Sequence, residues 1–155
     1  MRRMGFTMVE LLLVMGIFAI LIALSSVNYF STVNQNTVGN AENVLIADLR
    51  SAQNKAMSGT AVSGVSQTSW GVKFLSNSYV IFPGTTYSAS NTNNYVVTLP
   101  ERVVLSTTFP SSQVQFSRIS GEVMGYGNAT DTITLTVGSS SKTIELNVYG
   151  TITGS

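Results

Sequence analysis

The chain has no cysteine and no histidine among its 155 residues. Without cysteine it has no disulfide bond, no thiol nucleophile and no thiolate metal ligand. Without histidine it lacks the commonest general base and the commonest metal ligand. Most hydrolytic and metal-dependent reactions are thereby excluded, and we expect a protein that is not an enzyme and that has no metal site and no cofactor.

Charged residues are also few, with eight Lys and Arg against seven Asp and Glu. No block of basic residues marks a nucleic-acid-binding surface, so we do not expect nucleic acid as a partner. The carboxylates that follow residue 60 show no spacing that suggests a catalytic pair. They are Glu101, Glu122, Asp131 and Glu145.

Hydrophobic residues concentrate in residues 6–24, a run of 19 in which Glu10 is the only charge. As a helix this run would be about 28 Å long, close to the ~30 Å hydrocarbon core of a bilayer. Arg2 and Arg3 precede it, and the next basic residue is Arg50. The positive-inside rule therefore predicts one transmembrane helix over residues 6–24, with the amino terminus in the cytoplasm and the remainder extracytoplasmic.

Glu10 is the residue in this run that needs an explanation. A carboxylate in a spanning helix costs about 2.5–3.5 kcal/mol at the bilayer centre and less near its edge, so it usually indicates a partner or a function. A cleaved signal peptide, with Ser25 and Ser26 in the cleavage region, leaves Glu10 unexplained. An ordinary signal anchor, with Glu10 hydrated near the cytoplasmic headgroups, is the remaining alternative.

The residues around Glu10 favour a more specific interpretation. The sequence MGFTMVELL at residues 4–12 resembles the prepilin leader motif of the type IV pilin and pseudopilin family. The resemblance implies that residues 1–5 are a leader peptide, that a prepilin peptidase cuts after Gly5, and that Phe6 becomes the N-methylated amino terminus. It also implies that the Glu10 carboxylate meets the Phe6 amino group of a neighbouring subunit.

An opposite charge would lower the cost of placing Glu10 in the membrane. Two unit charges about 4 Å apart attract by ~4 kcal/mol at an effective dielectric near 20, similar to the insertion cost. The resemblance further implies four partners: the peptidase, other pilin or pseudopilin subunits in a helical filament, an inner-membrane assembly platform and membrane lipid. The implied location is the inner membrane as a single-pass protein, and then a pilus or pseudopilus.

Residues 25–58 are predicted to continue the helix outside the membrane. Apolar residues recur there at spacings of three and four, as on one face of a helix: Val38, Ala41, Leu45, Leu49, Ala52 and Ala56. Val44 is predicted to broaden this stripe. The charged residues are predicted to lie on the opposite faces, as on a helix that packs on a sheet: Glu42, Asp48, Arg50 and Lys55.

The predicted helix ends near Ser58-Gly59 because glycine commonly terminates helices. If it is continuous from Phe6 to Ser58, it has 53 residues and a length of roughly 80 Å. The sequence leaves continuity open, and a break would fall between Asn28 and Asn40.

Residues 59–155 are predicted to form one antiparallel β-rich domain, after a loop around residues 60–69. Alternating apolar and polar residues predict strands at residues 70–75, 79–82, 95–99, 103–105, 114–118, 133–137 and 144–148. Turns at residues 76–78 and 138–141 predict hairpins, with the Ile, Leu and Val residues of the last two strands facing one core. The predicted fold class is α+β and pilin-like, with a long amino-terminal helix packed on an antiparallel sheet.

Four short pieces of the domain resemble H-type minor pseudopilins of type II secretion and FimT/FimU-type minor pilins. These pieces are residues 49–56, 70–72, 116–121 and 144–152. We assign Gly121 and Gly150 to turns or bulges of the fold. The aromatic residues Trp70, Phe74, Phe82 and Phe116 are assigned to the core.

The polar tract of residues 85–94 is predicted to be an exposed loop. Taken together, the sequence predicts a structural minor pilin or pseudopilin of a type II secretion pseudopilus or a type IV pilus. The alternative is a DNA-binding minor pilin of a competence system, against which the scattered basic residues argue. Removal of Arg2 and Arg3 with the leader leaves six basic against seven acidic residues, which weakens attraction to DNA further.

Overall fold

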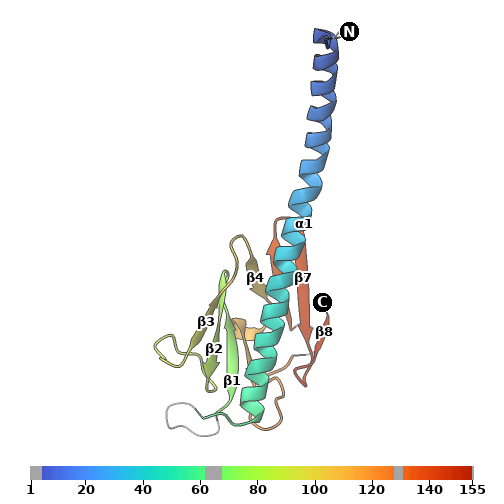
Figure 1. The fold of residues 1–155 in the computed structure, drawn as a ribbon. Coiled ribbons are helices and arrows are strands. Elements are labelled where there is room, and N and C mark those ends of the chain that lie inside the picture. Colours follow the sequence, from blue (N-terminus) through green and yellow to red (C-terminus); the bar gives the residue numbers. More distant parts are fainter. Residues whose placement is uncertain (1–4, 62–67, 128–130, 155) are drawn as a thin grey trace.

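The computed structural model describes residues 5–61, 68–127 and 131–154, without the side chains of residues 25–29 and 154. Most of the predicted leader (residues 1–4) and most of the loop predicted around residues 60–69 therefore lie outside the described residues. In the described chain, one long helix lies against a β-rich domain, and its first half projects beyond that domain (Figure 1).

The helix, α1 (Met8–Met57), has 50 residues and is about 75 Å long at 1.5 Å per residue. It begins at Met8 and not at Phe6 as predicted, because Thr7 is its N-cap. The Thr7 backbone is extended (φ −79°, ψ 151°), and its hydroxyl accepts a hydrogen bond from the Glu10 amide. The helix is continuous through residues 28–40, where the sequence left a break open.

A Schellman motif ends α1 one residue earlier than Ser58, in agreement with the predicted end near Ser58-Gly59. The Gly59 amide donates to the Ala56 carbonyl at 3.2 Å, and the Thr60 amide donates to the Lys55 carbonyl at 3.0 Å. These are the two bonds that define the motif. Gly59 has φ 62°, a conformation that glycine adopts without steric cost.

The described strands form two four-stranded antiparallel sheets. The first sheet has the order β3-β2-β1-β5, with β1 (Trp70–Phe74), β2 (Ser78–Pro83), β3 (Tyr95–Thr98) and β5 (Gln113–Phe116). The second has the order β4-β6-β7-β8, with β4 (Val104–Thr107), β6 (Thr132–Val137), β7 (Ser140–Leu146) and β8 (Ile152–Gly154). A short 3-10 helix, Pro110–Ser112, precedes β5.

The predicted α+β class is confirmed, and each predicted strand has its counterpart in β1–β7. Three details differ. The strands form two sheets, β8 was not predicted, and the β6–β7 turn is tighter than residues 138–141 because Val137 pairs directly with Ser140. Val148 is 37% exposed, because β7 ends at Leu146 and residue 148 no longer follows the alternation of the strand.

The core lies between α1 and both sheets, and the helix packs against β1, β6 and β7. The predicted stripe is confirmed, since all six of its residues are buried: Val38, Ala41, Leu45, Leu49, Ala52 and Ala56. The four assigned aromatic residues are buried as well. Val44 was predicted to broaden the stripe, but it is 52% exposed because it lies at the edge of the helix–sheet contact.

Two acidic residues of α1 do not lie on the solvent face as predicted. Glu42 is only 4% exposed, and Asp48 is half-buried and accepts a 2.6 Å hydrogen bond from the Tyr79 hydroxyl. Burial raises the pKa of the buried Tyr79 phenol well above its usual value, and the hydrogen bond to Asp48 raises it further. Tyr79 therefore stays a neutral donor that ties the helix to β2.

Replacement of Leu45 with alanine tests the helix–sheet contact. We expect Leu45→Ala to lower the free energy of unfolding by about 2–5 kcal/mol, because Leu45 is fully buried. The control Val44→Ala should cost about 0.5 kcal/mol or less, since its side chain is half exposed. Urea unfolding followed by fluorescence of Trp70, the single tryptophan, measures both; equal losses would contradict the assignment of the stripe.

Candidate functional site

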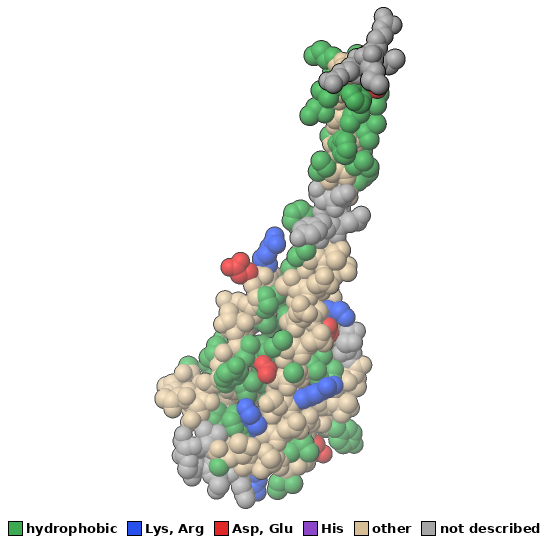
Figure 2. Space-filling model, viewed as in Figure 1, with side chains coloured by type: hydrophobic (Ala, Val, Ile, Leu, Met, Phe, Trp, Pro, Cys, Tyr) green, Lys and Arg blue, Asp and Glu red, His purple; other side chains and the backbone are tan. Residues whose placement is uncertain are grey.

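Exposed hydrophobic side chains cover the part of α1 that projects farthest from the domain (Figure 2). Between residues 6 and 24 the exposed fraction of the large apolar side chains runs from 41% at Val14 to 82% at Met8. Consecutive residues 11–15 are all exposed, so every face of this part of the helix is apolar. A surface of this kind on one molecule marks a site that another apolar phase or molecule covers.

The transmembrane assignment of residues 6–24 stays a prediction. Among the described residues, no helix combines the length and the mean hydropathy required of a membrane span.

The predicted processing residues lie at the free end of this segment. Gly5, Phe6 and Thr7 precede the helix and are exposed. Apart from its chain neighbours, no described residue has a heavy atom within 4 Å of the position that a Gly5 Cβ would occupy. The predicted scissile bond between Gly5 and Phe6 is therefore accessible and outside the helix. Glu10 is exposed in the first turn, where the helix dipole favours a negative charge.

Sequence reasoning missed the role of Thr7. Thr7 and Glu10 have the spacing of a capping box, in which Ser or Thr at the N-cap is followed three residues later by Glu or Gln. The Thr7 hydroxyl accepts the Glu10 amide at 3.3 Å. The signal for this role is the Thr-x-x-Glu spacing of residues 7–10.

The far end of α1 brings together distant pieces of the chain, in a cluster that we call the distal junction: Gln53, Gly121, Tyr149 and Gly150. The Gln53 side-chain amide donates to the Gly121 carbonyl at 2.9 Å and to the Tyr149 carbonyl at 2.8 Å. One helical side chain thereby fixes two loops that lie 68 and 96 residues away in the sequence.

Close approach at the distal junction requires both glycines. Gly121 and Gly150 each have φ 70°, which L side chains rarely adopt. A Cβ on Gly121 would lie 2.7 Å from Cγ of Met57, and one on Gly150 would lie 2.5 Å from Nε2 of Gln53. Their assignment to the fold is confirmed.

The four sequence pieces that suggested minor pseudopilins are thus brought to one end of the domain. Lys55, from the first piece, lies 4.8 Å from the ring centroid of Trp70, in the second, a cation–π distance. Gly71 permits close packing, because a Cβ there would lie 2.6 Å from Cζ of Phe82. These contacts hold the fold together and contain no reactive arrangement.

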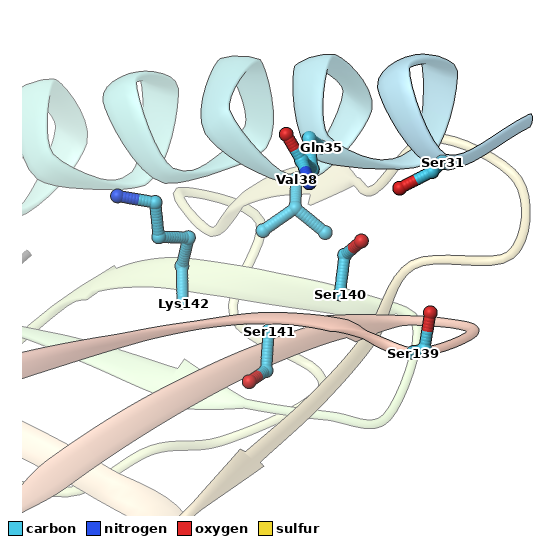
Figure 3. Close-up of a pocket in the computed structure, with 7 residues that line it drawn as sticks. All are labelled: Ser31, Gln35, Val38, Ser139, Ser140, Ser141 and Lys142. Carbon is cyan, nitrogen blue, oxygen red and sulfur yellow. The ribbon is translucent and has the colours of Figure 1, made fainter. Parts of the chain in front are cut away.

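A polar cleft of about 440 Å³ lies between α1 and the β6–β7 hairpin (Figure 3). It is lined by Ser31, Gln35 and Val38 of the helix and by residues 139–142 of the hairpin. Lys142 extends toward the helix, where its Nζ lies 3.6 Å from Oε2 of the buried Glu42, whose Oε1 has no hydrogen-bond partner among the described residues.

The residues that line the cleft supply hydroxyl groups but neither a histidine nor a carboxylate to activate them. The chain has no histidine, and the Lys142 ammonium is paired with a carboxylate. In the part of the chain that the structure describes, no group of three or more Asp or Glu side chains could hold a metal ion. The ion pair instead explains the wrong prediction for Glu42, because a counter-ion from the sheet compensates for its burial.

Together these features define a class of protein: an α+β subunit whose amino-terminal helix has one half free and apolar and the other half packed on antiparallel sheets, as in pilin-like folds.

Residues 1–26 match the model of a family described as the prokaryotic N-terminal methylation motif. No curated protein and no solved structure matches the chain. The match at the amino terminus supports a type IV pilin-like protein. The motif implies processing by a prepilin peptidase and assembly with other pilin subunits, and it indicates a structural subunit rather than an enzyme.

Alanine at Gly121 tests the distal junction. Gly121→Ala and its control Gly125→Ala both place a Cβ at φ near 70°, which costs about 1–2 kcal/mol. Only Gly121→Ala also displaces Met57, because nothing lies within 4 Å of a Cβ at Gly125. We expect Gly121→Ala to lose about 1 kcal/mol or more beyond the control in urea unfolding. Equal losses in the two variants would show that the positive φ, and not the contact with Met57, is the reason for glycine at position 121.

Loss of the Lys142 ammonium should leave a buried carboxylate without a partner. We expect Lys142→Met to lower the free energy of unfolding by about 1–3 kcal/mol. Lys73→Met is the matched control, since Lys73 donates to the Ser111 carbonyl and has no carboxylate partner among the described residues. The double variant Glu42→Leu/Lys142→Met should recover most of the loss. A double variant that is less stable than Lys142→Met would contradict the compensation of Glu42 by Lys142.

Proposed function

We propose that the protein is a minor structural subunit of a type II secretion pseudopilus or a type IV pilus, anchored in the inner membrane by residues 6–24 before assembly. The observation that carries this proposal is the exposed apolar half of α1, which is headed by the methylation motif and joined without a break to a folded domain. Lipid covers this half before assembly, and helices of neighbouring subunits cover it afterwards. Deletion of the gene tests which machine contains the subunit, through loss of protein secretion or loss of pili.

The accessibility of the Gly5–Phe6 bond supports cleavage at this position. Both residues are exposed and lie ahead of the helix, and glycine admits the backbone to a narrow protease site because it has no Cβ. Cleavage releases residues 1–5 on the cytoplasmic side and makes the Phe6 amino group, which is then methylated, the new terminus.

Glu10 is the proposed assembly residue. Its carboxylate forms no hydrogen bond or ion pair with another described residue, which leaves it available for the Phe6 amino group of a neighbouring subunit. Phe6 and Glu10 are four positions apart in the sequence, and Phe6 lies just ahead of the helix in which Glu10 is the third residue. Pairing across subunits therefore favours a small axial displacement between neighbours and acts as a register for assembly.

The attachment of the domain to the helix supports a mechanical role. Apolar packing, the Tyr79–Asp48 hydrogen bond, the Glu42–Lys142 ion pair and the Gln53 bonds are distributed along the second half of α1. Displacement of the helix in a growing filament thereby moves the domain with it.

The structure adds no support for the DNA-binding alternative. At least three of the six basic residues of the processed chain are engaged within the molecule: Lys55 with Trp70, Lys73 with Ser111 and Lys142 with Glu42. Phosphate binding needs several basic groups on one surface, and these contacts reduce the number available.

Replacement of Glu10 tests the assembly role. We expect Glu10→Ala and Glu10→Gln to be cleaved by the peptidase at the normal rate but to enter filaments at least about tenfold less than the natural chain, because ~4 kcal/mol of attraction exceeds the 1.4 kcal/mol of a tenfold change. Glu101→Ala is the control, since Glu101 is an exposed carboxylate of the domain. Immunoblots of precursor, processed chain and sheared filaments measure both steps. Normal incorporation of Glu10→Ala would rule out the register role.

A further inference from the structure

Thr7 determines where the helix begins relative to the predicted scissile bond. Its backbone is extended, and its Oγ1 accepts the amide of Glu10, the third residue of the helix, at 3.3 Å. An N-cap of this type satisfies one of the backbone donors that the first turn leaves without a partner. Because the cap is at Thr7, Gly5 and Phe6 stay outside the helix.

A second starting point for the helix lies two residues earlier. Glycine is an N-cap nearly as good as threonine, whereas valine and alanine are poor ones. If the Thr7 hydroxyl were absent, Gly5 would become the best N-cap ahead of Met8. Phe6 would then be the first helical residue, and the Gly5–Phe6 peptide would belong to the first helical turn.

The two starting points differ in what they offer a protease. With the cap at Thr7, the residues on both sides of the Gly5–Phe6 bond are extended or free to become so. With the cap at Gly5, the residues after the bond are helical, and the first turn must unwind before they can enter an extended binding site. If only a fraction of the precursor molecules has the extended conformation that the peptidase binds, the apparent affinity of the peptidase for the precursor falls by that fraction.

We propose that Thr7 is a positioning residue for leader cleavage, and that its hydroxyl selects the helix start at Met8 and thereby keeps the Gly5–Phe6 bond available to the peptidase. This inference rests on the proposed cleavage between Gly5 and Phe6. The hydroxyl also caps the Glu10 amide without using the Glu10 carboxylate, which remains available for assembly.

The experiment measures cleavage of the full-length precursor in detergent by a purified prepilin peptidase. Thr7→Val removes the hydroxyl and keeps the shape of the side chain. We expect it to raise KM about fivefold, as the loss of a typical N-cap would, with kcat unchanged. Thr7→Ser and Thr7→Asp keep an acceptor at the cap and should have the KM of the natural chain. Hydrogen exchange of the Val9 amide, which bonds to the Gly5 carbonyl only if the helix starts at Phe6, should slow in Thr7→Val alone.

Met8→Pro provides a rescue that adds no hydroxyl. Proline is favoured at the first helical position and holds the preceding residue in an extended conformation, so Thr7→Val/Met8→Pro should recover the natural KM. If Met8→Pro alone is processed normally and the double variant is not rescued, the Thr7 hydroxyl acts by contacting the peptidase and the inference is wrong. The inference is also wrong if Thr7→Val has the natural KM, or if Thr7→Ser is as poor as Thr7→Val. If the natural precursor is not cut after Gly5, the proposed function itself fails.

Discussion

Burial of one apolar stripe of α1 is the interaction on which the rest of the molecule depends. Six side chains at helical spacing, from Val38 to Ala56, are buried against two separate sheets. No direct strand pairing joins the two sheets in the described residues, so the helix that packs on both also holds them together. Because the stripe occupies only the second half of α1, the first half remains free for other contacts.

Polar contacts then fix the position of the helix on the sheets. Apolar burial is non-directional and would tolerate small shifts along the stripe. The Asp48–Tyr79 hydrogen bond, the Glu42–Lys142 ion pair and the two Gln53 bonds each require a particular position of the helix. Glu42, Asp48 and Gln53 lie about 1.5 turns apart, so they anchor the last third of the helix along its length. A domain that must move with its helix benefits from anchors of this kind.

The same helix meets a different requirement in its first half. Over residues 11–24 it carries exposed apolar side chains on every face, so this part has no side that could pack on a sheet while the others face water. Its amino end carries the groups for the proposed maturation: the accessible Gly5, the N-cap Thr7 two residues later, and the carboxylate of Glu10 in the first turn. A long helix without a break links that end to the domain.

The sequence by itself determined the features that depend on local pattern. The buried stripe followed from spacings of three and four, the end of the helix from Ser58-Gly59, and strands β1–β7 from alternation, because helix and strand periodicities are properties of adjacent residues. The methylation motif was equally local, and Gly5, Phe6 and Glu10 could be named from nine consecutive residues. The N-cap role of Thr7 also follows from a local pattern, Thr-x-x-Glu, but it was not among the sequence predictions.

Only the tertiary structure decided the features that depend on distant partners. Glu42 was predicted to face solvent because a carboxylate on a helix usually does, and its burial depends on Lys142, one hundred residues later. The role of Gln53 depends on carbonyl groups of two loops whose positions no local pattern specifies. The division of the strands between two sheets likewise depends on which strand edges meet after the chain has collapsed onto the helix. Periodicity identifies which face of an element is buried, but pairing between remote residues arises only when the fold brings them together.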